Sequence, residues 1–126
     1  MIDKLRNRMA QDEGFTLIEL LVVIIIIGIL LAIAVPSYLG FKDRANKSAA
    51  QANVRAAIPA VETWFADNNT YVGMTVTGLK AYDAGLKVSI GTTPALSVTT
   101  YCIYNTVGSF AYKKVGPGGQ ITNGSC

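Results

Sequence analysis

The sequence contains no histidine, a single tryptophan and only two cysteines among its 126 residues. The lack of histidine excludes imidazole metal sites, Ser–His–Asp triads and Cys–His pairs, which are among the commonest catalytic arrangements. Charged residues are also scarce, at 15% of the chain, and the formal net charge is only +3. That charge is too small to make a nucleic acid an obligatory direct partner. We therefore expect a protein that is not an enzyme and that needs neither a cofactor nor a metal ion.

Apolar residues make up 51% of the chain, and they are concentrated in one segment. Of the 21 residues at positions 15–35, 16 are Phe, Leu, Ile or Val. As a helix this segment is about 31 Å long, which matches the hydrocarbon thickness of a bilayer. Lys4, Arg6 and Arg8 precede it, and basic residues on that side favour a cytoplasmic N-terminus. The sequence predicts one membrane span, with the chain that follows it exported.

A conventional secretory signal peptide explains this segment less well. Such a peptide has a shorter apolar core and is cut behind it at a small-residue site. Here the run is longer, and Ala34-Val35-Pro36 is a poor site of that kind. We therefore interpret residues 15–36 as a hydrophobic helix that stays on the protein.

Helical signals resume after Pro36 and continue over residues 37–70. Val54, Ile58, Val61 and Phe65 recur at intervals of four, three and four residues, which places them on one face of an amphipathic helix. This face is predicted to pack against the rest of the chain.

Two local features of the same helix have physical consequences. Pro59 lies inside the helical pattern and is expected to kink the helix near Arg55, whose carbonyl it cannot engage. Asp43 and Lys47 are spaced for an ion pair one helical turn apart.

Residues 71–126 carry strand and turn signals. Leu86, Val88 and Ile90 alternate with polar residues, which is typical of a half-buried strand. Two further apolar and β-branched runs cover residues 96–107 and 109–115, with a turn at Gly108, and a short strand is expected at 120–122 after the turn Pro117-Gly118-Gly119. The predicted fold is therefore α+β, with a long N-terminal helix, membrane-spanning in its first half, packed against a small antiparallel sheet of three or four strands.

The two cysteines, Cys102 and Cys126, both lie in the sheet region. A pair of cysteines in an exported domain indicates a structural disulfide. The sheet region has too few residues to bury a large core unaided, so the helix face and a disulfide are both expected to stabilise it.

An abrupt change from polar to apolar residues occurs at Gly14-Phe15. A short charged leader, MIDKLRNRMAQDEG, ends in Gly14, and the apolar segment begins FTLIEL, with Glu19 at its fifth position. This combination closely resembles the class III signal of type IV pilins and pseudopilins. The resemblance implies that residues 1–14 form a leader, that a prepilin peptidase cuts after Gly14, and that the same enzyme N-methylates Phe15.

Glu19 is the only ionisable side chain between residues 15 and 35. A carboxylate inside a membrane is costly, so either it lies near the interface, protonated or snorkelling, or it has a functional partner. The resemblance implies that Glu19 of an incoming subunit meets the α-amino group of Phe15 on an assembled one. It also suggests that Gly28 and Pro36, which weaken the helix, let residues 28–36 extend or melt as subunits pack.

By the same resemblance, the chain is a pilin that assembles with copies of itself into a helical filament. Its expected partners are the membrane, the prepilin peptidase, an assembly platform protein and an ATPase. The precursor would be a single-pass protein of the cytoplasmic or inner membrane, and the assembled subunit would lie in an extracellular filament. Adhesion, motility and DNA uptake are all open as roles.

Two other interpretations of the chain stay open. A type II secretion pseudopilin shares the helix but typically has an acidic Ca²⁺ site in the C-terminal region, and here Asp83 is the only acidic residue after Asp67. A monomeric, membrane-anchored binding domain would use the apolar segment only as an anchor. The four lysines of the sheet region suit a solvated strand edge better than a DNA-binding surface; they are Lys80, Lys87, Lys113 and Lys114.

Overall fold

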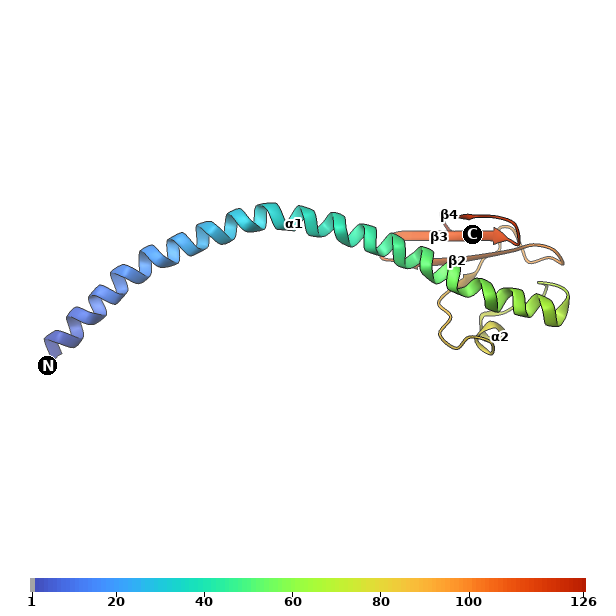
Figure 1. Ribbon diagram of the computed structural model, residues 1–126, viewed down its shortest axis with the longest axis horizontal. Helices are drawn as coiled ribbons and strands as arrows, with labels where there is room; N and C mark the ends of the chain where they lie inside the picture. Colours follow the sequence, from blue (N-terminus) through green and yellow to red (C-terminus); the bar gives the residue numbers. More distant parts are fainter. Residues whose placement is uncertain (1) are drawn as a thin grey trace. The chain divides into compact units, whose positions relative to one another are not determined.

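The computed structural model describes the backbone of residues 2–126 and the side chains of residues 16–126. Its elements, in chain order, are α1 (Ile2–Asn68), α2 (Val76–Lys80), β1 (Ser89–Ile90), β2 (Tyr101–Val107), β3 (Phe110–Gly116) and β4 (Ile121–Asn123) (Figure 1). The four strands form one antiparallel sheet in the order β1-β2-β3-β4. The predicted α+β class is confirmed. The chain divides into two units, Met1–Phe41 and Lys42–Cys126.

The first unit consists of the N-terminal part of α1. Every large apolar side chain from Leu17 to Phe41 is exposed, with exposed fractions between 45% and 73%. Within the described residues, one helix is long and apolar enough to cross a membrane, and its most apolar window has a mean hydropathy of 3.3. The unit therefore has an apolar surface that it does not bury itself.

The helix α1 continues through Pro36 and Pro59 without interruption. Each proline lacks the N–H that would bond to the carbonyl four residues earlier. Hydroxyl groups bond to backbone carbonyls nearby, from Ser37 to Ile33 at 3.1 Å and from Thr63 to Pro59 at 2.7 Å. The kink near Arg55 stays a prediction.

The helix α1 ends at Asn68, two residues before the end of the predicted helical range 37–70. Asn69 follows the last helical residue and has a φ of 56°, in the left-handed region that asparagine tolerates better than most residues. Its N–H donates to the Phe65 carbonyl at 2.7 Å. This bond satisfies one of the carbonyls left open at the helix C-terminus.

The short helix α2 was not predicted. It spans only five residues, two of which are valine and threonine and one glycine, so its intrinsic helix propensity is low. Thr75 caps it by accepting a bond from the Gly78 N–H at 3.0 Å, and Leu79 is completely buried. Burial of Leu79 in the core therefore explains a helix that local propensity does not favour.

Two of the predicted strands are shorter than expected. The alternation at residues 86–90 is confirmed by the burial of Leu86 and Val88, but only Ser89 and Ile90 pair with β2. The carbonyl of Lys87 instead accepts a bond from the side-chain amide of Asn105. Residues 96–100 form a turn, because the Ser97 N–H bonds to the Thr100 carbonyl at 3.0 Å, so β2 begins at Tyr101.

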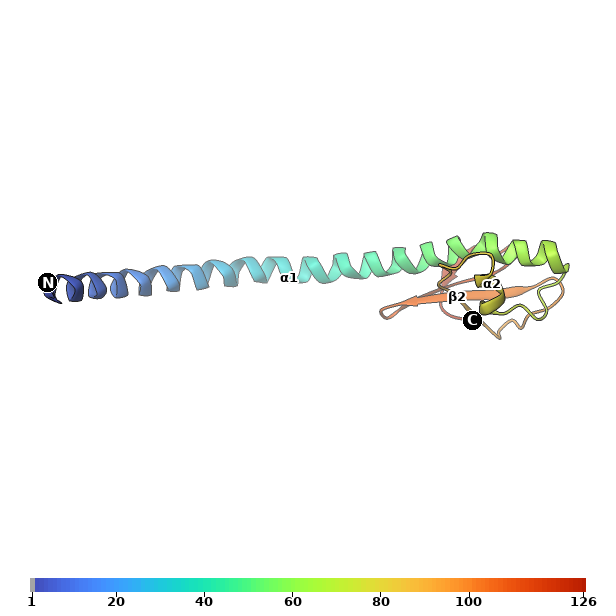
Figure 2. The same ribbon diagram turned by 90° about the horizontal axis from the view of Figure 1, so that it is seen from below.

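The hydrophobic core lies between the C-terminal part of α1 and the sheet (Figures 1 and 2). Val54 and Val61, from the predicted helix face, are fully buried, whereas Ile58 and Phe65 are half-buried. The sheet contributes Tyr101 and Ile103. Other fully or nearly fully buried members are Ala57, Ala60, Tyr71, Met74, Leu79, Leu86 and Val88.

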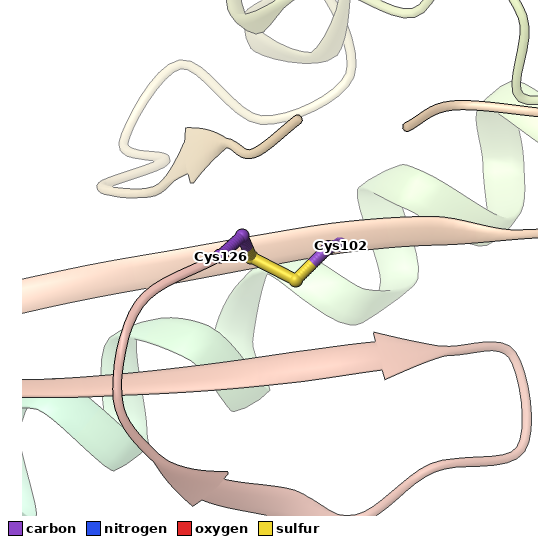
Figure 3. The surroundings of a disulfide bond; sticks show 2 residues. All are labelled: Cys102 and Cys126. Carbon is purple, nitrogen blue, oxygen red and sulfur yellow. A yellow bond between two sulfur atoms is a disulfide. The ribbon is translucent and has the colours of Figure 1, made fainter. Parts of the chain in front are cut away.

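A disulfide joins Cys102 in β2 to the C-terminal Cys126 (Figure 3). The two residues are 24 apart in the chain, and Cys102 is fully buried. A Cβ atom on Gly91 would lie only 1.9 Å from the Cys126 Cβ, so the C-terminal tail packs directly on the backbone after β1. The crosslink therefore holds the tail against the centre of the sheet.

We expect removal of the disulfide to destabilise the unit Lys42–Cys126. In the chain-entropy model, closing a loop of this length is worth roughly 3–4 kcal/mol. Replacing both cysteines with alanine should therefore lower the free energy of unfolding by about 2–4 kcal/mol. Denaturant unfolding of the detergent-solubilised chain, followed by Trp64 fluorescence, measures the change. The wild type in reductant should approach the variant, and equal stability of the oxidised wild type and the variant would contradict the expectation.

A second prediction concerns the contact between Gly116 in β3 and the buried ring of Tyr101. A Cβ at position 116 would lie 2.1 Å from the Tyr101 Cζ, and that ring is held by Tyr71 at 4.7 Å between centroids. Gly116→Ala should lower the free energy of unfolding by about 2 kcal/mol or more, because the packed ring has little room to move. Gly118→Ala is the matched control, since no atom lies within 4 Å of its added Cβ. Equal unfolding curves for the two variants would refute the steric argument.

Candidate functional site

The predicted functional residues fall into two groups. Gly14 and Phe15, the predicted cleavage site, lie outside the residues whose side chains the structure describes. Glu19, Gly28 and Pro36 lie on α1 in the unit Met1–Phe41. The disulfide cysteines, Cys102 and Cys126, belong to the other unit, Lys42–Cys126.

Glu19 is exposed on α1 and is surrounded in sequence by exposed apolar side chains. Ile18 and Leu20 beside it are 68% and 53% exposed. The carboxylate makes no hydrogen bond or ion pair with any other residue that the structure describes. A charge in this apolar environment is expensive once water is removed, and no contact with a described residue offsets that cost.

Gly28 and Pro36 are not explained by packing within the chain. No atom lies within 4 Å of a Cβ built on Gly28. Glycine costs about 1 kcal/mol relative to alanine in a helix, and proline about 3 kcal/mol. Both residues thus weaken α1: no described atom packs on the Gly28 position, and beside Pro36 the Ser37 hydroxyl donates to the Ile33 carbonyl at 3.1 Å.

In the unit Lys42–Cys126, two tyrosine hydroxyls donate to carboxylates, and a third tyrosine hydroxyl is buried. The Tyr71 hydroxyl donates to Glu62 at 3.3 Å, and the Tyr82 hydroxyl donates to Asp67 at 2.5 Å. The hydroxyl of Tyr101 is buried and has no hydrogen-bond partner among residues 16–126. The sequence alone did not predict these pairings, because Glu62 is nine residues from Tyr71.

The pKa values of these tyrosines are all raised. Burial is the main cause for Tyr71 and Tyr101, and the negative charge of Glu62 adds to it. For Tyr82 the main cause is its hydrogen bond to Asp67, which favours the protonated hydroxyl. A tyrosine whose pKa lies above 10 keeps its proton at neutral pH, so these residues serve packing and hydrogen bonding.

A hollow of about 380 Å³ lies between α1 and the turn that joins β3 to β4. Its charged lining residues are Arg55 and Lys114, and its apolar lining residues are Ile58 and Ile121. The remaining lining residues are Gln51, Gly119 and Gln120. We call this hollow the Arg55 groove. The sequence alone does not reveal this groove, because the lining residues from α1 and those from the sheet are more than 50 residues apart in the chain.

The described part of the chain contains no group of three or more His, Cys, Asp and Glu side chains that could hold a metal ion.

Comparisons with known proteins match the N-terminal segment to a known motif and a longer part of the chain to pilus proteins. Residues 9–35 match the prokaryotic N-terminal methylation motif. The chain is 37% identical over 99 residues to the type IV wide pilus major component PilA4 of Thermus thermophilus, covering 75% of this chain and 73% of that protein. It is also 43% identical over 61 residues to the type IV major pilin protein PilA of Myxococcus xanthus, covering 48% of this chain and 28% of that protein.

Type II secretion proteins are similar over a shorter stretch than PilA4. Core protein G of Pectobacterium carotovorum is 38% identical over 71 residues, which is 56% of this chain and 45% of that protein. The chain thus spans less than half of two of these relatives and nearly three quarters of the third. The match to PilA4 is longer than the 67 residues of α1, so it reaches beyond the helix. The methylation motif, the unburied apolar helix and this extended similarity together place the chain in the type IV pilin family.

Proposed function

We propose that this chain is a structural subunit of a type IV pilus-like filament, assembled from a membrane-anchored precursor. The observation that carries the proposal is the apolar surface of α1 between Leu17 and Phe41, which the chain leaves exposed. A bilayer can cover that surface in the precursor, and neighbouring helices can cover it in a filament. No catalytic role is assigned to any residue.

In this proposal, processing prepares the chain for assembly. A prepilin peptidase cuts between Gly14 and Phe15 and N-methylates Phe15. The cut removes residues 1–14, whose three basic and three acidic side chains oppose transfer into an apolar environment. It also creates an α-amino cation at the start of the apolar segment, and N-methylation leaves that cation charged.

The new cation provides a partner for Glu19. The carboxylate has no partner among the described residues, and the amine of Phe15 on a neighbouring subunit would neutralise it. An ion pair in an apolar environment is favourable relative to either charge alone, so mispositioned subunits would leave two unpaired charges. The pair would thereby set the axial register between subunits.

Gly28 and Pro36 are given a role in the assembled state. The segment they bound is helical in the isolated chain. Because both residues lower helix stability, residues 28–36 are the part of α1 that can extend at lowest cost when subunits pack.

The length of the alignment with PilA4 favours a pilus subunit over a type II secretion pseudopilin. The alignment with PilA4 covers 99 residues and includes part of the region after α1. The alignments with type II secretion core proteins G cover between 61 and 71 residues. Two other pilus relatives align over only 61 and 56 residues, so the support for a pilus subunit comes from the PilA4 alignment.

The processing step is tested by the mass of the mature protein. Intact-mass and N-terminal peptide spectra of the membrane-extracted chain should show a subunit that begins with N-methyl-Phe15. Gly14→Val should leave the chain uncut, because a β-branched residue restricts the backbone that the peptidase must hold. A wild-type chain that still begins at Met1, or that is cut near Pro36, would refute both the processing and the filament proposal.

The pairing of Glu19 is tested by removing its charge. Glu19→Ala should be processed normally but should reduce sheared filament yield at least about tenfold, because one buried charge is left without a partner. Glu19→Gln keeps the shape of the side chain and should give the same loss. Immunoblots of sheared filaments and of whole cells measure yield and expression. Normal filament yield from either variant would show that the charge is not needed.

A further inference from the structure

One acidic side chain in the described part of the unit Lys42–Cys126 has no partner there. The other three carboxylates are engaged: Glu62 accepts from the Tyr71 hydroxyl, Asp67 from the Tyr82 hydroxyl, and Asp83 from the Gly85 N–H at 3.0 Å. Asp43 is exposed on α1 and makes no such contact with the described residues. It is therefore a free carboxylate on the surface of this unit.

Asp43 is free because its expected partner lies elsewhere. The one-turn spacing predicted an ion pair with Lys47, and this prediction is wrong. The Lys47 ammonium instead lies 4.9 Å from the ring centroid of Phe110, near the turn between β2 and β3. This cation–π contact ties the hairpin to α1, and it leaves the carboxylate one turn earlier without a counter-ion.

The Arg55 groove has the opposite character. Its lining includes two cations and two side-chain amides but no carboxylate. The Arg55 guanidinium is exposed and makes no hydrogen bond or ion pair with any described residue. Lys114 donates to the Gly119 carbonyl at 2.5 Å, which holds its ammonium in place and leaves two of its three donors for another acceptor. The planar fork of Arg55 suits a carboxylate in particular.

Asp43 cannot occupy the groove of its own chain. The two residues are twelve positions apart on one continuous helix, which separates them by about 18 Å along the axis and by about a third of a turn around it. The side chains are too short to bridge that distance. A contact between these two residues is therefore possible only between two copies.

We propose that the Arg55 groove of one subunit binds the Asp43 carboxylate of a second copy of this chain. The inference rests on the proposed filament function. The contact joins two different surface patches, so it is a head-to-tail interface, which is the type that generates open helical assemblies. If neighbouring helices run parallel, the pairing fixes an axial stagger of about 18 Å between the two copies.

The test exchanges the two charges. Arg55→Glu and Asp43→Arg, each alone, should reduce sheared filament yield at least about tenfold, because every such contact then places like charges together. The double variant restores opposite charges with reversed polarity and should recover yield to within about threefold of wild type. Lys87→Glu is the matched control, since it makes the same charge change at an exposed lysine outside the groove lining.

Further readouts separate this inference from the function on which it rests. Each variant is checked for the mature N-terminal mass and for its thermal unfolding temperature, so that failure to process or fold is recognised. If wild-type cells make no filament that contains this chain, the proposed function itself fails. If wild-type filaments form but the single variants assemble normally, or the double variant is no better than either single variant, the Asp43–Arg55 contact is refuted and the filament function stands.

Discussion

The structure of this protein depends on one constraint: a helical surface about 20 residues long that is apolar on nearly every side and is covered by no other residue in the described part of the chain. Fully burying one large apolar side chain is worth about 1.5–3 kcal/mol, so a surface with more than a dozen of them is strongly driven out of water. A membrane and a bundle of neighbouring helices are two environments that satisfy it. The same residues can therefore serve first as an anchor and then as an assembly surface.

That constraint explains why the few polar or helix-weakening residues inside the segment matter. Glu19 would cost several kcal/mol without a partner in an apolar environment. Gly28 and Pro36 both reduce helix stability, and no described atom packs on the Gly28 position. In a water-exposed helix the carboxylate of Glu19 would carry no such cost, whereas Gly28 and Pro36 weaken a helix in any environment. In this segment each has a cost, which makes a role in assembly the simplest physical explanation for them.

The unit Lys42–Cys126 contains a small sheet, which is stabilised by packing against the C-terminal part of α1. The C-terminal part of α1 provides one side of the core through Val54 and Val61, and β2 provides the other through Tyr101 and Ile103. The disulfide and the Lys47–Phe110 contact fasten two further parts of the sheet. The surface of this unit carries two charged features of opposite sign, the free Asp43 carboxylate and the Arg55 groove.

The sequence by itself determined the α+β class, the apolar span, the end of α1 near Asn68 and the turn at Gly108. It also singled out Glu19 as the ionisable residue, and Gly28 and Pro36 as the helix-weakening residues, of the apolar segment. These follow from local patterns of hydrophobicity, turn residues and charge, which need no knowledge of distant contacts. The tertiary structure alone decided the helix α2, the late start of β2 at Tyr101 and the preference of Lys47 for Phe110 over Asp43. It also decided the pairing of Tyr71 with Glu62 and the existence of the Arg55 groove. Each of these depends on residues far apart in the chain, where burial of Leu79 or the nearness of an aromatic ring outweighs local propensity and spacing.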